Sequence, residues 1–586
     1  MRNKLMSFVT MLMFSSAVTA QLTSPLVNTP IPPSPNSAAF RQFAGYTPNL
    51  ATGTVNVPIP LYDIKVGDFT LPLSMQYYTQ GIKMTDDPYP LGYGWVFSPG
   101  LRITRTIMGR PDMYHTFDVQ QSPEDAFTYG KKAMYDYEQH LHSGWDYDDV
   151  TDTQHDVFTL HLPHGNYTFF LEKDANGKWN AVTADNLLKI EVESVLAFKV
   201  TDGNGIVYHF GGGELNDNPC YELYHGRYAT SWMLRQIVLP GANRTIDFEW
   251  DEVYHSALVY GPFLGGDILE DHKEQYHNVP DDTNPTYVSA SEAGLVCHFG
   301  EYNEVLHLKQ VRFPGGQVDF TYKSTTNPLL EKILVTNMFG TAVRQIDFDY
   351  GTGSDERLLM SVDFSDEGVY AFDYHASRFS GNLNAQDWWG YYNGKANTEL
   401  VPQIWLKTYN SSIPGASTSY QQYGSADRSI NATAMQANML TKVTYPTGGY
   451  TSFEYEPHRF TGSLTTNEGL GTLSRFRLTE GGGLRIKKMT SSTGGNAPAV
   501  VKNYTYGTGG NGLANVIYEP TLETFIDELN AYNYGTDDYG VSYGYNHRNL
   551  IVNSQSNYMR GAMNTPALWY PTVTESVAGE GKTVYT

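Results

Sequence analysis

The sequence has few cysteines, comparatively few basic residues and little continuous apolar sequence. Two cysteines in 586 residues, Cys220 and Cys297, exclude a dense disulfide framework; one disulfide between them and two free buried thiols remain the alternatives. Beyond the N-terminus no run approaches the ~18 apolar residues of a membrane helix, so we expect no membrane insertion. Acidic residues outnumber basic ones by 62 to 39, which argues against nucleic-acid binding.

The longest apolar run lies at the N-terminus and has the features of a secretory signal. Arg2 and Lys4 precede the apolar stretch Leu5–Phe14, and the small-residue ending Val18-Thr19-Ala20 follows. This order predicts a signal peptide over residues 1–20, with cleavage before Gln21. A signal anchor is the alternative, although the run is short for one. We therefore expect an exported protein that is periplasmic, displayed on the cell surface or secreted.

The composition predicts an all-β fold. Aromatic residues make up 14% of the chain, with 44 Tyr and 55 Gly, whereas charged residues make up only 17%. This mixture favours pleated, half-buried strands joined by tight turns, that is, large sheets of antiparallel hairpins and meanders with few short helices. Residues 54–75 alternate apolar and polar residues on both sides of Lys65–Asp68, as in a hairpin. Ser122-Pro123 predicts one helix that runs to about His140.

A loose repeat occupies the middle of the chain. Each copy has two strand-like segments around a Pro/Gly turn. The clear copies are Leu234–Trp250, Leu308–Tyr322 and Leu440–Tyr455, and weaker ones run over Leu330–Tyr350 and Leu359–Tyr374. Because an isolated hairpin is only marginally stable in water, we expect these units to pair edge to edge in a continuous sheet or spiral.

Five segments resemble hallmarks of the secreted Rhs/YD-repeat proteins of Bacteroidetes. They are residues 34–84, 91–112, DWWGYYNG at 387–394, 439–458 and GGGLRIKKM at 481–489. The resemblance implies a large β-sheet assembly, since YD repeats in better-understood relatives spiral into a hollow shell around a C-terminal toxin or display domain. A long downstream array of YD repeats and the self-cleaving Rhs core are missing here. Asp87-Pro88 lies in the N-terminal region, so it inherits no catalytic role from that core.

These features divide the chain into five expected parts. They are a signal peptide (1–20), a Pro-rich leader (21–36), an N-terminal β domain (37–225), YD/Rhs-like hairpin repeats (226–460) and a C-terminal β region (461–586). The last hairpin, Pro571–Thr586, ends within its second strand. We therefore expect the C-terminal region to be incomplete and to pair with a downstream Rhs/YD-repeat segment or a partner chain.

Two glycine-containing motifs match enzyme fingerprints only formally. Gly540-Val541-Ser542-Tyr543-Gly544 has the nucleophile-elbow pattern, but its flanks lack the strand and the helix that such an elbow needs, and a Tyr/Gly-rich loop is favoured. Gly507–Gly512 fits a dinucleotide fingerprint, yet no helix opens after it, so we interpret it as a long hairpin loop.

Candidate metal ligands are scattered rather than spaced as a site. The histidines lack a compact spacing and the aspartates lack the glycine and closing glutamate of an EF-hand, so we predict no metal and no cofactor. The residues concerned are His140, His142, His155, His161, His164, Asp146, Asp148, Asp149 and Asp152.

Four neighbouring aromatic residues could bind a sugar by stacking. Trp388, Trp389, Tyr391 and Tyr392 would suit a cell-surface glycan if exposed, although core packing is the commoner use of such residues. Overall we predict a non-catalytic exported β-scaffold, the N-terminal part of an Rhs/YD-repeat shell for toxin delivery or surface interaction. An aromatic-rich carbohydrate-binding or adhesion module is the first alternative. A secreted serine hydrolase using Ser542 and a distant His547 is the second.

Overall fold

The computed structural model describes residues 46–586 with gaps. The gaps are 84–85, 87, 89, 99, 107–111, 113–154, 186, 213–220, 225–227, 242–243, 257–267, 280–291, 300–301, 325–327, 366, 410–417, 463–464, 467–474, 477–478, 496, 518, 521–525, 537–541 and 554–566. Only the strand backbone is described at 221–228, 252–305, 404–421, 423, 465–466, 475–476 and 526–553. The predicted signal peptide, leader, helix at 122–140 and aspartate cluster lie outside the described residues, as do Cys220, His140 and His142. The side chain of Cys297 is not described either, so the disulfide stays a prediction.

The predicted all-β class is confirmed. Strands dominate, and the only helices in the described residues are three short 3-10 turns. Among those residues no helix is long and apolar enough to cross a membrane. The predicted N-terminal hairpin is present as β1 (Val55–Val66) and β2 (Phe69–Thr79), with β3 (Trp95–Ser98) next to β2. Alternate residues of β1 and β2 are buried, as expected for a half-buried sheet.

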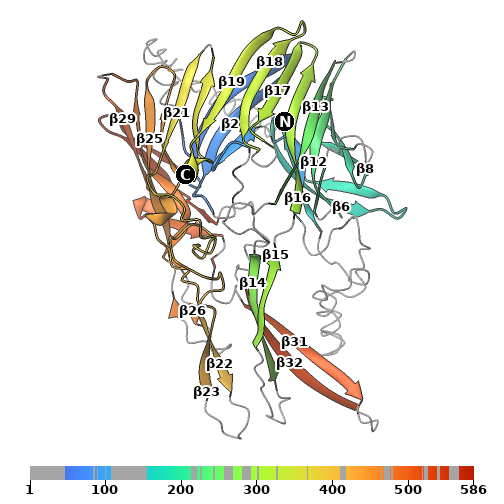
Figure 1. Cartoon of the computed structure of the whole chain (residues 1–586), viewed down its shortest axis with the longest axis vertical. Helices are drawn as coiled ribbons and strands as arrows, with labels where there is room; N and C mark the ends of the chain where they lie inside the picture. Colours follow the sequence, from blue (N-terminus) through green and yellow to red (C-terminus); the bar gives the residue numbers. More distant parts are fainter. Residues whose placement is uncertain are drawn as a thin grey trace, which may run out of the picture. The chain divides into compact units, whose positions relative to one another are not determined.

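A second, larger sheet consists of consecutive hairpins that can be followed in Figure 1. Its hairpins are β12 (Tyr228–Leu239) with β13 (Arg244–Ser256), β16 (Tyr302–Phe313) with β17 (Gly316–Tyr322), β18 (Leu330–Asn337) with β19 (Ala342–Tyr350), β20 (Leu359–Phe364) with β21 (Gly368–Tyr374), β24 (Leu440–Thr444) with β25 (Tyr450–Phe460), β28 (Glu480–Ser492) with β29 (Val500–Tyr506), and β34 (Val573–Val577) with β35 (Gly581–Tyr585). The second strand of each hairpin pairs with the first strand of the next. The five predicted repeats are thus hairpins of one continuous sheet.

The sheet continues on the N-terminal side of β12. There β12 pairs with β4 (Arg102–Thr106), β10 (Val207–Gly211) and β11 (Tyr221–Tyr224). From β4 the ladder passes to β5 (Val157–Leu162), β6 (Gly165–Lys173) and β7 (Trp179–Thr183), and from β10 to β9 (Ala197–Thr201) and β8 (Lys189–Ser194).

The connections of the large sheet differ in length between its two ends. The turns within hairpins are tight, whereas the connections between hairpins leave from the opposite strand ends and include all the long segments. These segments carry β14 (Ile268–Val279), β15 (Glu292–Phe299), β22 (Ile404–Tyr409), β23 (Thr418–Tyr423), β26 (Thr465–Thr466), β27 (Arg475–Phe476), β30 (Leu513–Val516), β31 (Ile526–Thr536), β32 (Ser542–Asn553) and β33 (Leu568–Trp569). Two distant connections join through the ladder β15-β14-β32-β31.

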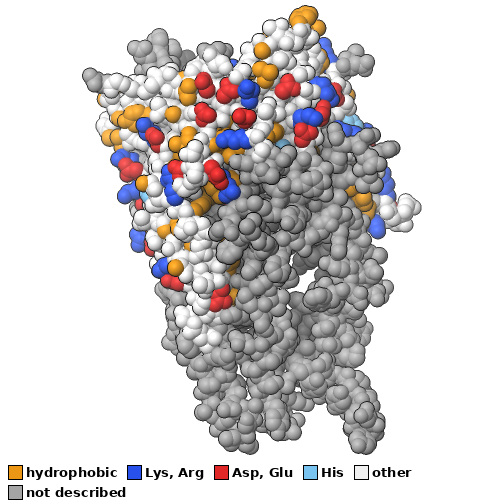
Figure 2. Space-filling model, viewed as in Figure 1, with side chains coloured by type: hydrophobic (Ala, Val, Ile, Leu, Met, Phe, Trp, Pro, Cys, Tyr) orange, Lys and Arg blue, Asp and Glu red, His pale blue; other side chains and the backbone are white. Residues whose placement is uncertain are grey.

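The two faces of the repeat hairpins differ in chemistry. Val311, Ile333, Val362 and Val443 are fully buried on one face. The other face carries cross-strand ion pairs, such as Lys309 with Glu249, Lys442 with Asp373 and Lys488 with Glu454, and Figure 2 shows acidic and basic side chains interspersed over the described surface. The exposed pairs add little stability individually, so burial on the inner face holds the sheet.

Candidate functional site

The repeat hairpins share an aromatic latch. In six of these hairpins the second strand contains the pattern aromatic, any residue, aromatic, and the last aromatic side chain donates a hydrogen bond to the backbone carbonyl of a residue in the first strand of the same hairpin. The bonds are Trp250 Nε1 to Leu234 (2.9 Å), Tyr322 Oη to Leu308 (2.7 Å), Tyr350 Oη to Leu330 (3.0 Å), Tyr374 Oη to Leu359 (2.7 Å), Tyr455 Oη to Leu440 (2.6 Å) and Tyr506 Oη to Ile486 (2.5 Å). We call these aromatic residues the latch residues and their partners the start residues.

The latch residues also set the register between hairpins. Each lies directly opposite a branched aliphatic residue in the first strand of the next hairpin. The pairs are Trp250 with Leu308, Tyr322 with Leu330, Tyr350 with Leu359, Tyr374 with Leu440, Tyr455 with Ile486 and Tyr506 with Val573. In the first five the strand of the next hairpin has a β-bulge at this place, with one extra residue directly after the aliphatic residue that lies opposite the latch residue. The bulge locally changes which side chains of that strand share a face.

The N-terminal segment binds the other polar group of several start residues. Leu234 N donates to Leu101 O (2.8 Å), Leu330 N to Pro90 O (2.8 Å), Leu440 N to Tyr77 Oη (3.0 Å) and Ile486 N to Gly53 O (2.9 Å). In these four hairpins the start residue is therefore held from two sides, by its own latch residue and by the segment 53–101.

Aromatic packing fills the space between the N-terminal sheet and the repeats. Trp95 packs against Phe372 with ring centroids 4.7 Å apart, and its indole N–H donates to Tyr374 Oη at 3.0 Å. Burial raises the pKa of Tyr77 and of the latch residues Tyr350 and Tyr455, so these hydroxyls stay protonated and act as hydrogen-bond donors. The latches are thus structural links and not nucleophiles.

The DWWGYYNG motif forms a five-residue turn that recurs in this chain. At Asp387 the side-chain Oδ1 accepts from the amides of Trp389 (2.9 Å) and Tyr391 (3.0 Å), and Gly390 has a φ of 88°. The turns that begin at Asp174, Asp202 and Asn337 use the same side-chain acceptor and a Gly with positive φ at the fourth position. A side-chain acceptor followed three residues later by Gly is therefore the local rule.

Asp387 differs from the other turn residues because it is fully buried. Its Oδ2 has no hydrogen-bond partner among the described residues. Burial raises the pKa of Asp387 to about 6, although the two amides and the nearby charge of Arg428 oppose the shift. Arg428, also buried, donates to the carbonyls of Asp387 (2.9 Å) and Leu400 (2.8 Å), and burial lowers its pKa to about 10. At neutral pH the negative Asp387 and the positive Arg428 therefore attract each other, while burial disfavours both charges.

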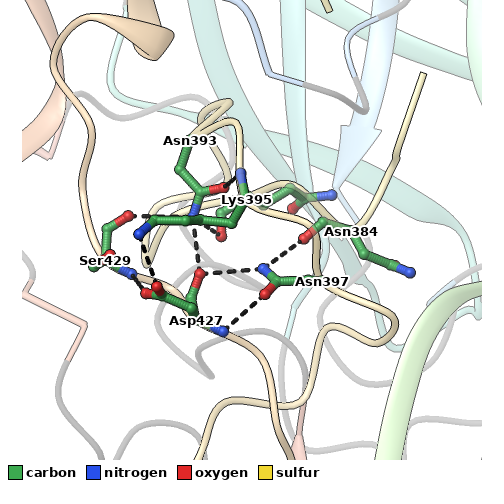
Figure 3. Close-up of polar contacts among 7 residues, drawn as sticks. Asn384, Asn393, Lys395, Asn397, Asp427 and Ser429 are labelled. Atoms are coloured by element: carbon green, nitrogen blue, oxygen red, sulfur yellow. Dashed lines mark hydrogen bonds and ion pairs between the residues drawn. The ribbon is translucent and has the colours of Figure 1, made fainter. Parts of the chain in front are cut away.

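Amide side chains fix the rest of this motif, as Figure 3 shows. Asn393 Nδ2 donates to the carbonyls of Gln386 (2.9 Å) and Asp427 (2.9 Å), and Asn397 Nδ2 donates to Asp427 O (3.1 Å). Lys395 Nζ lies 2.8 Å from Asp427 Oδ2. These contacts satisfy backbone groups of two loops, so the cluster ties 382–397 to 424–431 and leaves no open set of ligands.

The GGGLRI motif lets a strand approach the motif DWWGYYNG closely. Gly481, Gly482 and Gly483 have φ of 123°, 72° and 104°. A Cβ on Gly481 would meet the Trp389 ring, and one on Gly483 would lie 2.6 Å from Gln80 O. Three of the family-like segments, including the N-terminal one, thus meet at one place where only glycine fits.

A buried polar cluster closes the same region. Arg485 donates to Glu456 Oε1 (2.8 Å) and to Tyr570 Oη (2.7 Å), and Tyr570 Oη lies 2.7 Å from His458 Nδ1. Tyr570 can accept from Arg485 and donate to His458 only if Nδ1 is unprotonated. Burial and the Arg485 charge lower the pKa of His458 to about 3, in agreement with this arrangement. His458 cannot reach solvent, which argues against a role as general base.

The predicted site residues are not assembled into a reaction centre. Trp389, Tyr391 and Tyr392 are buried, which fits the packing alternative, and Trp388 is half-buried; glycan binding by them stays a prediction. Ser542 begins β32, so Tyr543 and Gly544 lie in a strand that continues to Asn553 instead of the expected loop. Gly507–Gly512 is a connection from β29 to β30, which pair with different strands, and not a hairpin loop as expected.

His155, His161 and His164 are separate side chains. His155 lies near Asp112, His161 bonds Asn166 at 2.9 Å, and His164 is exposed. The described residues contain no group of three metal-ligating side chains. The latch was missed in the sequence although the signal for it was present, because aromatic-x-aromatic closes every repeat from Phe248-Glu-Trp250 to Tyr504-Thr-Tyr506.

No protein-family model matches the chain, and no curated protein matches it. Similar solved structures include the crystal structure of TcdB2-TccC3, with 12% identity and a TM-score of 0.31 over 74% of this chain and 22% of that chain. TcdB2-TccC3-TEV matches with 9% identity and a TM-score of 0.28 over 92% of this chain and 36% of that chain. TcdB2-TccC3-Cdc42 matches with 10% identity and a TM-score of 0.23 over 89% and 31%. The chain spans about a third or less of these proteins.

Proposed function

We propose that this chain is an exported, non-catalytic β-scaffold of the Rhs/YD-repeat type, the N-terminal part of a shell for toxin delivery or surface interaction. The observation that carries the proposal is the double hold on the start residues, by their own latch residues and by the segment 53–101. These hydrogen bonds link several hairpins of a long sheet to one N-terminal segment, and they provide no reactive group. Export rests on the N-terminal sequence alone.

The scaffold role requires the repeats to unfold as one unit. Deleting Leu440–Tyr455 removes β24 and the first part of β25, which connect β21 to β28. We expect this deletion to expose the whole region from Trp232 onward to limited proteolysis, because each hairpin covers the edge of its neighbour. A protease-resistant core over 232–375 in the deletion variant would contradict the proposal.

The two alternatives have their own tests. A serine hydrolase would label at Ser542 with a fluorophosphonate, and Ser542→Ala would abolish the label; we expect no labelling. A carbohydrate-binding module would lose glycan-array binding in Trp388→Ala with unchanged thermal stability; we expect no such loss. Positive results would replace the scaffold with an enzyme or an adhesion module.

A further inference from the structure

The strand β35 differs from every other second strand of the repeat hairpins. Four of its five residues are exposed, and Val584 is 51% exposed. In the described residues β35 is hydrogen-bonded to β34 on one side only. An exposed strand edge with unpaired amides and carbonyls is a template for another strand.

Tyr585 occupies the place of a latch residue in this edge. It pairs with Val573, which in turn pairs with the latch residue Tyr506, so the three residues share one row and one face of the sheet. β35 ends in Thr583-Val584-Tyr585, so it has the aromatic residue of the latch position, although Thr583 stands where the six latch-bearing strands have a second aromatic residue. In the row of Tyr585, β35 therefore presents an aromatic residue as those six strands do where they receive a strand.

We infer that the β35 edge is a binding site for an antiparallel strand of stated pattern, with a branched aliphatic residue opposite Tyr585 and a second apolar residue three positions later. The pattern comes from the strands already seated on latch residues. Opposite the latch residues these strands carry Leu308, Leu330, Leu359, Leu440 and Ile486, and the residues three positions later, Val311, Ile333, Val362, Val443 and Met489, are buried. The occupant is a protein strand of repeat-hairpin chemistry.

This inference rests on the proposed scaffold function, and it adds which kind of strand the β35 edge would bind. Backbone pairing supplies affinity, and the aliphatic residue opposite Tyr585 supplies register, because a slip by one residue would turn every side chain to the other face. A strand without the aliphatic residue could still pair with the edge but would lack the register signal.

A peptide-binding experiment tests the site on the full chain. The probe is a fluorescent peptide that copies residues 440–455, measured by anisotropy, with a Leu440→Asp peptide as its control. We expect saturable binding that is at least about tenfold weaker for the Asp peptide, since tenfold corresponds to only about 1.4 kcal/mol. Equal binding of both peptides, or no saturable binding, would overturn the inference.

Variants of the edge show where the peptide binds. Val584→Pro removes an amide and obstructs an incoming strand, so it should abolish binding, whereas Val584→Thr keeps the strand and should bind normally. If Val584→Pro lowers the melting temperature, Val584→Lys replaces it, because it keeps the amide but discourages pairing. Binding that survives these substitutions overturns the site. If the chain unfolds cooperatively but does not bind the peptide, the strand-binding site at β35 is refuted and the scaffold proposal stands. If the chain unfolds non-cooperatively, the scaffold proposal itself is refuted.

Discussion

The hydroxyl of Tyr455 donates a 2.6 Å hydrogen bond to the backbone carbonyl of Leu440, fifteen residues earlier in the chain. The same Leu440 gives its amide proton to Tyr77 at 3.0 Å. One residue at the start of a hairpin is thus fastened by that hairpin's own end and by a strand from the N-terminal sheet. Because both partners are buried, neither bond can be replaced by water without cost.

Tyr455→Phe should destabilise the sheet by about 1–2 kcal/mol, because the change keeps the ring but leaves a buried carbonyl with one partner fewer. Urea unfolding followed by fluorescence measures the effect. Tyr450→Phe is the control, since Tyr450 is half-buried beneath Lys442 and is not a latch residue. Equal midpoints for the two variants would show that the latch contributes no stability.

Gly449→Val should destabilise the β24–β25 turn strongly. A Cβ at Gly449 would lie 2.8 Å from Ser492 O, which is backbone and cannot rotate away. The positive φ of 82° that the turn needs is at Gly448. Gly203→Ala is the control, because its Cβ would make ordinary contact with Leu187 at 3.6 Å. A melting temperature of Gly449→Val within about 1 °C of the wild type would refute the turn geometry.

Asp387→Asn should change how stability depends on pH. The pKa of Asp387 in the folded chain is raised to about 6, so its contribution is fully present below the unfolded value near 3.9 and is lost as the pH rises through 6. Asn keeps the Oδ1 acceptor and cannot ionise. The stability of Asp387→Asn relative to wild type should therefore increase between pH 4 and 7, by at most about 1.4 kcal/mol per pH unit.

Asp174→Asn is the matched control for Asp387→Asn. Asp174 has the same role in an exposed turn, where amide hydrogen bonds lower the pKa of its carboxyl. Its contribution is present above the unfolded pKa and is lost as the pH falls, so the sign is opposite. Urea unfolding at several pH values measures both variants. Identical slopes would contradict the assignment of a buried, poorly compensated charge to Asp387.

His458→Gln should reduce the loss of stability in acid. The pKa of His458 in the folded chain is lowered to about 3, so its contribution is fully present above the unfolded value near 6.5 and is lost as the pH falls toward 3. The total loss is on the order of 4 kcal/mol. Gln keeps a polar group near Tyr570 and does not titrate. His164→Gln, at an exposed residue, is the control; if both variants behave alike, His458 is not the group responsible.

The sequence could predict the hairpins because their signals are local. Alternation in β1 and β2 and Pro/Gly turns such as Pro314-Gly315 act within a few residues, and the hairpins they predict appear where expected. The final hairpin around Gly579–Gly581 also follows from such signals. Burial of DWWGYYNG was the favoured alternative on composition alone.

The sequence by itself determined the all-β class, the repeated hairpins and the positions of their tight turns, because period-two patterning and turn chemistry act over short distances. Only the tertiary structure decided which distant residues the hairpins contact. The hydrogen bonds from Leu440 to Tyr77 and from Arg485 to Tyr570 join residues hundreds or tens of positions apart, and the bulges opposite the latch residues arise from strand pairing. The buried charge of Asp387 is likewise a property of its surroundings, since the same turn at Asp174 lies in solvent.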